Sequence, residues 1–229
     1  MDFREKYNEF LNSVEQRMYE YVKSGEQKNL YDPFEYIVSG GGKRIRPVLT
    51  LISAGAVGGD PYSAVDPAVA IEILHNFTLV HDDIMDESSI RRGRDTIHIK
   101  WSEATAILTG DVMVGHSYKL LPKAKNHQEA DSIMEVFTQG LIDVCEGQAM
   151  DMEFNERRDV KIEDYLLMIE KKTARLLQTS AKIGAFMGHG NIDEIESLSS
   201  YAYNLGMGFQ IQDDLLDISA DEKQLGKSS

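Results

Sequence analysis

The sequence has little of several residue types that mark large classes of proteins. Its 229 residues include one cysteine, Cys145, which excludes an internal disulfide framework and a zinc site built from several cysteines. No apolar run approaches the ~18 to 20 residues of a membrane-spanning helix, because Ser, Thr, Gly or charged residues interrupt every candidate. Residues 1–5 contain no apolar segment of the signal-peptide type. These absences predict a cytoplasmic protein without membrane spans, in which Cys145 is a small core residue.

Basic residues are also scarce. Lys and Arg total 24 against 38 Asp and Glu, which gives a formal net charge of −14. Such a charge argues against a surface that binds nucleic acid or anionic membranes. The basic residues nevertheless gather in two short segments, residues 43–46 and 91–94. If the protein binds phosphate groups, we expect it to bind them locally, at these segments.

The hydrophobic pattern is typical of helices. Apolar residues recur at spacings of three and four through most of the chain, whereas the alternation typical of strands is hard to find. Asp66-Pro67 predicts a helix cap followed by proline at the first helical position, in a helix that runs to about Asp86. Arg46-Pro47 predicts the start of another helix. Further helices are expected over residues 102–121, 128–154, 162–187 and 192–219, and loops over 40–42, 58–59 and 88–95. With no linker, repeat or low-complexity segment, residues 1–229 are expected to form a single all-α domain.

Two aspartate clusters share the pattern Asp-Asp-x-x-Asp. The first is Asp82-Asp83-Ile84-Met85-Asp86, and the second is Asp213-Asp214-Leu215-Leu216-Asp217. In a helix, the first and last aspartates of each cluster lie one turn apart and share a face. One such cluster alone could be a solvated acidic surface. Two are more than chance predicts in a chain of this composition.

Both clusters follow apolar helical stretches that are expected to face a core. Carboxylates at such positions need cations to offset the free energy of their burial. Ligand sets made of oxygen alone, without His or Cys, suit a hard ion such as Mg²⁺ or Mn²⁺, which keeps water ligands and shares its coordination with phosphate groups. The pattern therefore predicts a site for divalent cations and a phosphorylated substrate.

The two basic segments fit the same interpretation. Residues 40–47 combine a glycine-rich loop, three cations and a helix N-terminus, which together are typical of an anion site. Arg91 and Arg92 follow Asp82 closely enough to hold a diphosphate that is bound to metal at the same helix end. His75 lies two turns before Asp82 on the same face, where it either reaches the anion or is an ordinary core histidine.

With these features, the sequence resembles the trans-isoprenyl diphosphate synthases, the family of farnesyl and geranylgeranyl diphosphate synthases. The resemblance covers nearly the whole chain, and its five segments follow the family's order. They are Gly41-Gly42-Lys43-Arg44-Ile45-Arg46-Pro47, residues 75–86 with Arg91-Arg92-Gly93, Gly147-Gln148-Ala149-Met150-Asp151, Lys172-Thr173, and residues 209–217. The resemblance implies a helical bundle around a deep central cavity, the isoprenoid synthase fold, with the two aspartate clusters facing each other across its mouth.

The resemblance also implies which residues bind each ligand. Several Mg²⁺ ions are expected to bridge an allylic diphosphate to Asp82, Asp86 and Asp213, supported by Asp83, Asp214 and Asp217. The same diphosphate is expected to be held by Arg91, Lys172 and Lys227. The residues expected near the developing allylic cation are Thr173 and Gln210. The diphosphate of isopentenyl diphosphate is expected to be held by Lys43, Arg46, His75 and Arg92.

The implied reaction transfers a prenyl group from dimethylallyl, geranyl or farnesyl diphosphate to isopentenyl diphosphate. Metal ions and cationic side chains stabilise the departing diphosphate, so that the allylic C–O bond ionises and the isopentenyl double bond attacks the cation. The isopentenyl double bond is itself the nucleophile, so no protein nucleophile is needed, and the released diphosphate takes the final proton. Apolar walls must exclude water. The family also implies a homodimer, for which residues 102–121 and 128–154 are candidate interface helices.

Product length is expected to depend on residues just before the first aspartate cluster. Phe77 resembles the bulky residue of geranylgeranyl-forming family members, and Thr78 beside it is small, which favours a C20 product, geranylgeranyl diphosphate. By helical geometry, Thr78 lies nearer than Phe77 to the aspartate face. Phe77 could therefore instead be an ordinary core residue with no effect on product length.

The chain departs from the family at its C-terminal end. It stops at residue 229, shortly after Lys227, inside a segment that family members continue with further helices. We therefore expect the domain formed by residues 1–229 to lack the C-terminal helices of the bundle.

Three alternatives differ in identifiable residues. A terpene cyclase of the same fold also ionises allylic diphosphates on Mg²⁺, but it would lack the second diphosphate site at Lys43, Arg46 and Arg92. A non-catalytic subunit of a hetero-oligomeric prenyl synthase would be expected to have degraded aspartate motifs, and both are intact here. A di-iron carboxylate bundle needs two Glu-x-x-His motifs, and the sequence has one, from Glu72 to His75.

Overall fold

Helices make up most of the described structure and strands very little of it, which confirms the all-α prediction. The computed structural model describes residues 2–22, 25–122 and 128–225, with side chains described as far as residue 216. The α-helices are α1 (Phe3–Val22), α2 (Lys28–Val38), α3 (Ile45–Ala56), α4 (Val65–Met85), α5 (Ile97–Lys100), α6 (Glu103–Lys119), α7 (Ala130–Phe154), α8 (Ile162–Ile169), α9 (Arg175–Met187) and α10 (Ile192–Leu225). A 3₁₀ turn, η1 (Pro61–Ala64), precedes α4, and a π-helical turn, η2 (Glu170–Ala174), joins α8 to α9.

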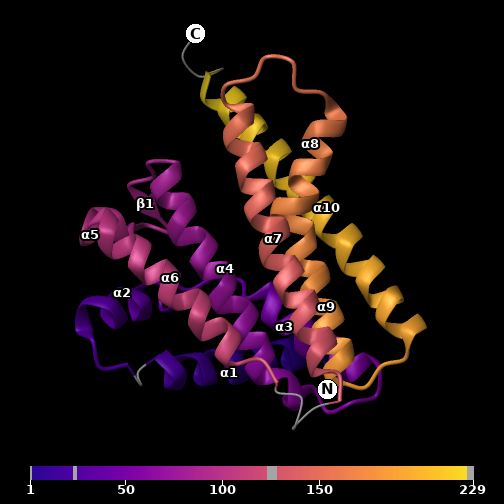
Figure 1. Cartoon of the computed structure of the whole chain (residues 1–229). Helices are drawn as coiled ribbons and strands as arrows, with labels where there is room; N and C mark the ends of the chain where they lie inside the picture. Colours follow the sequence, from indigo (N-terminus) through magenta and orange to yellow (C-terminus); the bar gives the residue numbers. More distant parts are fainter. Residues whose placement is uncertain (1, 23–24, 123–127, 226–229) are drawn as a thin grey trace.

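The helices form two groups, as Figure 1 shows. Helices α7 to α10 run side by side in one group, and α1 to α6 form the other. The groups join mainly where α3 packs against α9. Gly184 on α9 permits this close approach, because a Cβ atom there would lie 2.8 Å from Ser53 Cβ and would also overlap the carbonyl oxygen of Thr50.

Helix α4 is buried on almost all sides. Every residue from Pro67 to Leu74 is buried, as expected for a helix that is largely apolar around its circumference. Its last turns are more polar and carry Asp82 and Asp83, with Asp86 as the C-cap. Packing of α4 in the core thus holds the first aspartate cluster at the end of a fixed helix. None of the described helices is both long and apolar enough to cross a membrane.

The starts of two helices correct the sequence predictions. Helix α4 begins at Val65 after η1, and its N-cap is Ala64 rather than Asp66. The Asp66 carboxylate instead accepts a hydrogen bond from Arg17 Nε at 2.6 Å, which links α1 to α4. Helix α3 begins at Ile45, one residue earlier than predicted.

Two further predictions are wrong. The segment 88–95 is not simply a loop, because β1 (Ile90–Arg91) and β2 (Arg94–Asp95) pair antiparallel in it. The two residues between these strands, Arg92 and Gly93, have positive φ angles of 52° and 74°, which permit the tight turn. Cys145 is exposed on α7 and is not a core residue.

Candidate active site

A cavity of about 770 Å³ is lined by residues of α3, α4, α7, η2, α9 and α10 and by the segments that follow α2 and α4. It brings together residues from motifs that are far apart in the sequence. The predicted site residues that line it are Lys43, Arg46, His75, Thr78, Asp82, Arg91, Arg92, Lys172, Thr173, Gln210 and Asp213. Those that do not line it are Phe77, Asp83, Asp86 and Asp214. Lys227 and the side chain of Asp217 lie outside the described residues.

Two carboxylates enter this cavity from different helices, Asp82 from α4 and Asp213 from α10. Burial raises the pKa of Asp82 to about 6, an effect that the Lys172 charge opposes and the Asp86 charge increases. Within the described part of the chain, no cationic group lies within ion-pair distance of the Asp82 carboxylate. Asp82 is therefore a half-buried carboxylate that still lacks a direct counter-charge.

The other described aspartates of the two clusters have different surroundings. Asp83 is buried and accepts a hydrogen bond from Arg91 Nε at 2.8 Å. Asp214 accepts hydrogen bonds from the Tyr165 hydroxyl at 2.5 Å and from Gln210 Nε2 at 2.8 Å. Burial and the bond to Asp214 raise the pKa of Tyr165 to about 12, so Tyr165 stays protonated as a donor. Asp83 and Asp214 therefore hold neighbouring side chains in place.

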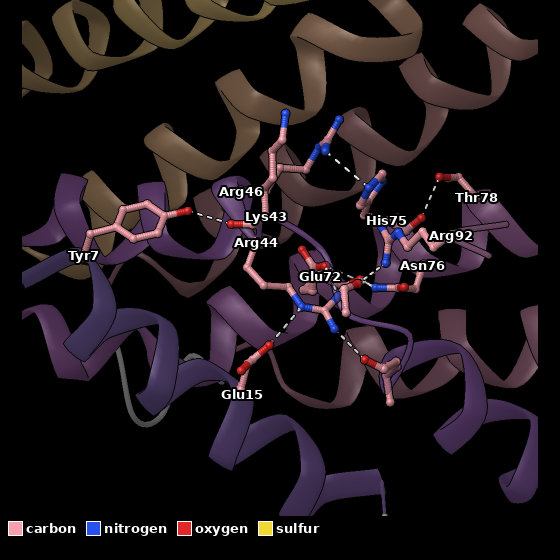
Figure 2. Close-up of polar contacts among 12 residues, drawn as sticks. Tyr7, Glu15, Lys43, Arg44, Arg46, Glu72, His75, Asn76, Thr78 and Arg92 are labelled. Atoms are coloured by element: carbon pink, nitrogen blue, oxygen red, sulfur yellow. Dashed lines mark hydrogen bonds and ion pairs between the residues drawn. The ribbon is translucent and has the colours of Figure 1, made fainter. Parts of the chain in front are cut away.

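The basic side of the cavity is formed by the loop after α2 and by the turn after β1. Arg46 Nη1 lies 3.3 Å from His75 Nε2, and Arg92 hydrogen-bonds the carbonyl oxygen of Gly41, which brings the two basic segments together. Burial lowers the pKa of His75 well below its usual range, and the charges of Arg46 and Arg92 lower it further. His75 is therefore a neutral imidazole whose Nε2 accepts a hydrogen bond from Arg46. Figure 2 shows this contact with Lys43 beside it.

The opposite wall is formed by η2 and α10. Lys172 Nζ lies 2.5 Å from Asp151 Oδ2, and Thr173 Oγ1 donates a hydrogen bond to Gln210 Oε1 at 2.8 Å. Both Lys172 and Thr173 belong to the π-helical turn, a distortion that is frequent at functional sites. The turn places two consecutive side chains at one cavity.

A second, more apolar cavity of about 230 Å³ adjoins the first. Phe77, Met85 and Met152 line it, and Thr78 and Asp82 line both cavities. The Phe77 ring packs edge-on against His81, with their centroids 4.8 Å apart. Phe77 is thus a wall of this second space, and Thr78 lies at the junction of the two.

The donor set at the aspartate clusters suits a hard divalent cation. Its donors are carboxylate oxygens, and the Asp82 carboxylate lacks a direct counter-charge. Across the described segments, no three His, Cys, Asp or Glu side chains form a metal site by themselves. A cation here would therefore need further oxygen ligands from water or a bound diphosphate, which is the coordination that Mg²⁺ prefers.

Comparison with known proteins confirms the resemblance found in the sequence. The family model of polyprenyl synthetase matches residues 27–229. The chain belongs to the polyprenyl synthetase family. Among members of this family, the short chain isoprenyl diphosphate synthase of Methanothermobacter thermautotrophicus is 42% identical over 99% of this chain, which covers 69% of that protein. The geranylgeranyl diphosphate synthase of Sulfolobus acidocaldarius is 42% identical over 98% of this chain, which again covers 69% of the relative.

Solved structures of polyprenyl synthetase relatives have the same fold. The geranylgeranyl pyrophosphate synthetase from Pyrococcus horikoshii Ot3 is similar to this chain with a TM-score of 0.89 at 40% identity. The match covers 98% of this chain and 70% of that structure. The similarity confirms the isoprenoid synthase fold predicted from the sequence.

Four residues that support the site were not predicted from the sequence. They are Arg44, Glu72, Asp151 and Tyr165. Arg44 and Asp151 lie inside motifs that the sequence shows, so their positions were visible but their roles were not. Tyr165 carries no local signal, because its contact with Asp214 joins residues that are 49 positions apart.

Proposed function

We propose that this protein is an isoprenyl diphosphate synthase, a transferase of prenyl groups. It condenses isopentenyl diphosphate with dimethylallyl, geranyl or farnesyl diphosphate to make geranylgeranyl diphosphate. One observation carries this proposal. A single cavity combines two carboxylates from separate helices with two groups of cations, one formed by Lys43, Arg46 and Arg92 and the other by Arg91 and Lys172. Such a cavity suits two diphosphates, one bound through metal and one bound by side chains alone.

The metal-binding side of the proposal uses Asp82, Asp86 and Asp213, with Asp83, Asp214 and Asp217 in supporting positions. Several Mg²⁺ ions, or Mn²⁺ ions in their place, would neutralise these carboxylates together with the allylic diphosphate. Bound there, the ions would supply Lewis-acid stabilisation of the leaving diphosphate. The unneutralised charge of Asp82 in its half-buried position supports this assignment.

The side chains of the chain itself would bind, orient and shield the reactants. Arg91, Lys172 and Lys227 would hold the allylic diphosphate, and Lys43, Arg46, His75 and Arg92 would hold the isopentenyl diphosphate. The Thr173 hydroxyl donates a hydrogen bond to Gln210 Oε1, so the lone pairs of its oxygen remain available to the developing allylic cation. Leu79, Val144 and Leu176 supply apolar wall that helps to exclude water.

A C20 product is the part of the proposal that depends on the second cavity. Thr78 lines both cavities, and Phe77 lines only the second, more apolar one. Several relatives, including those of Sulfolobus acidocaldarius and Methanosarcina mazei, are geranylgeranyl diphosphate synthases, which supports C20 over other lengths.

We further propose a cytoplasmic homodimer in which residues 1–229 belong to one isoprenoid synthase domain. Large apolar side chains are exposed on the two predicted interface helices, α6 and α7. They are Ile107, Leu108, Met134 and Ile142. A second copy of the chain would remove this apolar surface from water.

The proposal is tested by Mg²⁺-dependent incorporation of labelled isopentenyl diphosphate by the complete gene product. Dimethylallyl, geranyl and farnesyl diphosphates are supplied separately as primers, and products are resolved by chain length. We expect label in a C20 product, and its loss in Asp82→Ala and in Asp213→Ala. Asp193→Ala, an exposed change on the same helix as Asp213, serves as the matched control and should keep full activity.

The alternatives predict other results. A terpene cyclase would consume an allylic diphosphate without incorporating the isopentenyl label. A folded protein that consumes neither substrate would contradict the synthase proposal and favour a non-catalytic subunit.

A further inference from the structure

The basic loop after α2 contains one arginine that differs from its neighbours. Lys43 is exposed at the cavity, whereas Arg44 is 3% exposed and Arg46 is partly buried. Figure 2 shows the Arg44 guanidinium on the side of the loop opposite to Lys43 and Arg46. Arg44 borders the same cavity, but its guanidinium hydrogen-bonds to groups of the protein, Glu72 and the Val38 carbonyl oxygen, instead of extending toward a ligand.

Arg44 has a buried carboxylate partner on α4. Its Nη1 donates to Glu72 Oε1 at 2.6 Å, and Glu72 is only 2% exposed. Asn76 Nδ2 lies 3.3 Å from the same Glu72 oxygen and donates to the Glu72 carbonyl oxygen at 2.7 Å. The Glu72 carboxylate is thus held by Arg44 and by Asn76 of its own helix.

The same guanidinium reaches two more helices. Nη2 donates to the carbonyl oxygen of Val38 at the end of α2, and Nε lies 3.7 Å from Glu15 Oε1 on α1. One side chain thereby links α1, the end of α2, the start of α3 and the centre of α4. A planar guanidinium with five N–H donors can make these contacts together, and a lysine ammonium cannot reproduce the geometry.

The backbone of Arg44 depends on these contacts. Its φ of 48° and ψ of 35° lie in the left-handed region, which is uncommon for a residue other than glycine. Such a conformation persists when surrounding contacts hold it. The left-handed conformation directs the Arg44 side chain to Glu72 and Val38, while Lys43 and Arg46 extend from the other side of the loop (Figure 2). The side-chain directions of the loop therefore follow from the pairing of Arg44.

The Arg44–Glu72 contact also fixes the position of the loop along α4. Glu72 and His75 lie about one turn apart on α4, so the Arg44–Glu72 contact and the Arg46–His75 contact lie one above the other. A loop that lost its contact with Glu72 would also lose the constraint that places Arg46 beside His75.

We propose that Arg44 and Glu72 are positioning residues for isopentenyl diphosphate, because their buried ion pair holds Lys43 and Arg46 in the arrangement that binds its diphosphate. The inference rests on the proposed function. It assigns to Arg44 and Glu72 a specific effect on one of the two substrates, with no contact to the reacting atoms.

The test separates the two substrates kinetically. Arg44→Lys keeps the positive charge but removes the guanidinium group, which donates hydrogen bonds to both Glu72 and the Val38 carbonyl oxygen. We expect its KM for isopentenyl diphosphate to rise about tenfold, the equivalent of one charge-assisted hydrogen bond. The KM for geranyl diphosphate and the kcat at saturating isopentenyl diphosphate should stay near the wild-type values. Glu72→Gln keeps an acceptor oxygen for Arg44. It should also raise the KM for isopentenyl diphosphate and not the KM for geranyl diphosphate, but by a smaller factor than Arg44→Lys.

Arg17→Lys is the matched control. Arg17 of α1 contacts Asp66 of α4 at 2.6 Å, the same distance as in the Arg44–Glu72 contact, but neither residue belongs to the loop after α2. We expect it to leave both KM values unchanged. Thermal unfolding of all variants shows whether a change in KM accompanies a general loss of stability, and Glu72→Gln decides the question if Arg44→Lys does not fold.

The inference is overturned if Arg44→Lys and Glu72→Gln leave KM unchanged, or if they raise both KM values equally. A wild-type protein that incorporates no isopentenyl diphosphate would contradict the proposed function separately. In that case, calorimetric titration with inorganic pyrophosphate in EDTA still decides the positioning role, since Arg44→Lys must weaken that binding relative to Arg17→Lys.

Discussion

Gly147 on α7 lies against the backbone of η2, and its replacement by alanine should displace the part of the site that η2 carries. A Cβ atom at Gly147 would lie 2.7 Å from Lys172 Cα and 2.9 Å from the carbonyl carbon of Lys171, and would also overlap the Lys172 nitrogen. These are backbone atoms, so no side-chain rotation relieves the overlap. Helix α7 and η2 would have to separate by about 1 Å to restore ordinary contact distances.

Two opposing terms set the expected stability change of Gly147→Ala. Overpacking of this kind costs about 1 to 3 kcal/mol. Alanine in place of glycine inside a helix returns about 1 kcal/mol. Because backbone atoms are in contact, we expect the cost near its upper limit, which gives a net loss of about 2 kcal/mol in the free energy of unfolding.

The effect on activity should be larger than the effect on stability suggests. A displacement of η2 moves both Lys172 and Thr173, and a misplacement of about 1 Å can lower a rate roughly 100-fold. Urea unfolding and the turnover of folded protein at low temperature measure the two effects separately. Gly115→Ala on α6 is the matched control, because no atom lies near its added Cβ, and it should raise stability by about 0.5 to 1 kcal/mol. The reasoning is refuted if Gly147→Ala behaves like Gly115→Ala and keeps its activity.

Three further predictions concern other parts of the molecule. Because the pKa of His75 is lowered in the folded state, the unfolded chain binds more protons than the folded one below about pH 6.5. The free energy of unfolding therefore decreases as the pH is lowered through this range. Urea unfolding should show that His75→Gln loses about 1 kcal/mol less than wild type between pH 7.5 and 5.5, and an equal loss would contradict a neutral His75. Thr78→Phe should narrow the junction between the two cavities and shift the product from C20 to C15, and an unchanged C20 product would show that Thr78 does not limit length. Leu108→Asp, at a side chain that is 60% exposed on α6, should convert the proposed homodimer to a monomer in sedimentation velocity, and an unchanged dimer would place the interface elsewhere.

Helix positions and motif residues could be predicted because their signals are local. The three- and four-residue spacing of apolar side chains predicts the long helices. Ser102 caps α6, because its hydroxyl oxygen accepts a hydrogen bond from the Thr105 N–H. The cap at Asp66 was wrong for a non-local reason. Its carboxylate pairs with Arg17 of α1, and α4 already begins at Val65, directly after η1.

The sequence by itself determined the family, the helical fold and the residues that share each motif, since helical periodicity and residue chemistry are properties of a short stretch of chain. Only the tertiary structure decided which charged groups are paired. Asp83 is neutralised by Arg91, Asp214 is held by Tyr165, and Asp82 is left without a direct counter-charge. It likewise paired Arg44 with the buried Glu72, although both border the cavity, while the neighbouring Lys43 is exposed there. Each of these outcomes depends on a partner from another element, and packing between helices, rather than spacing within one, brings that partner into contact.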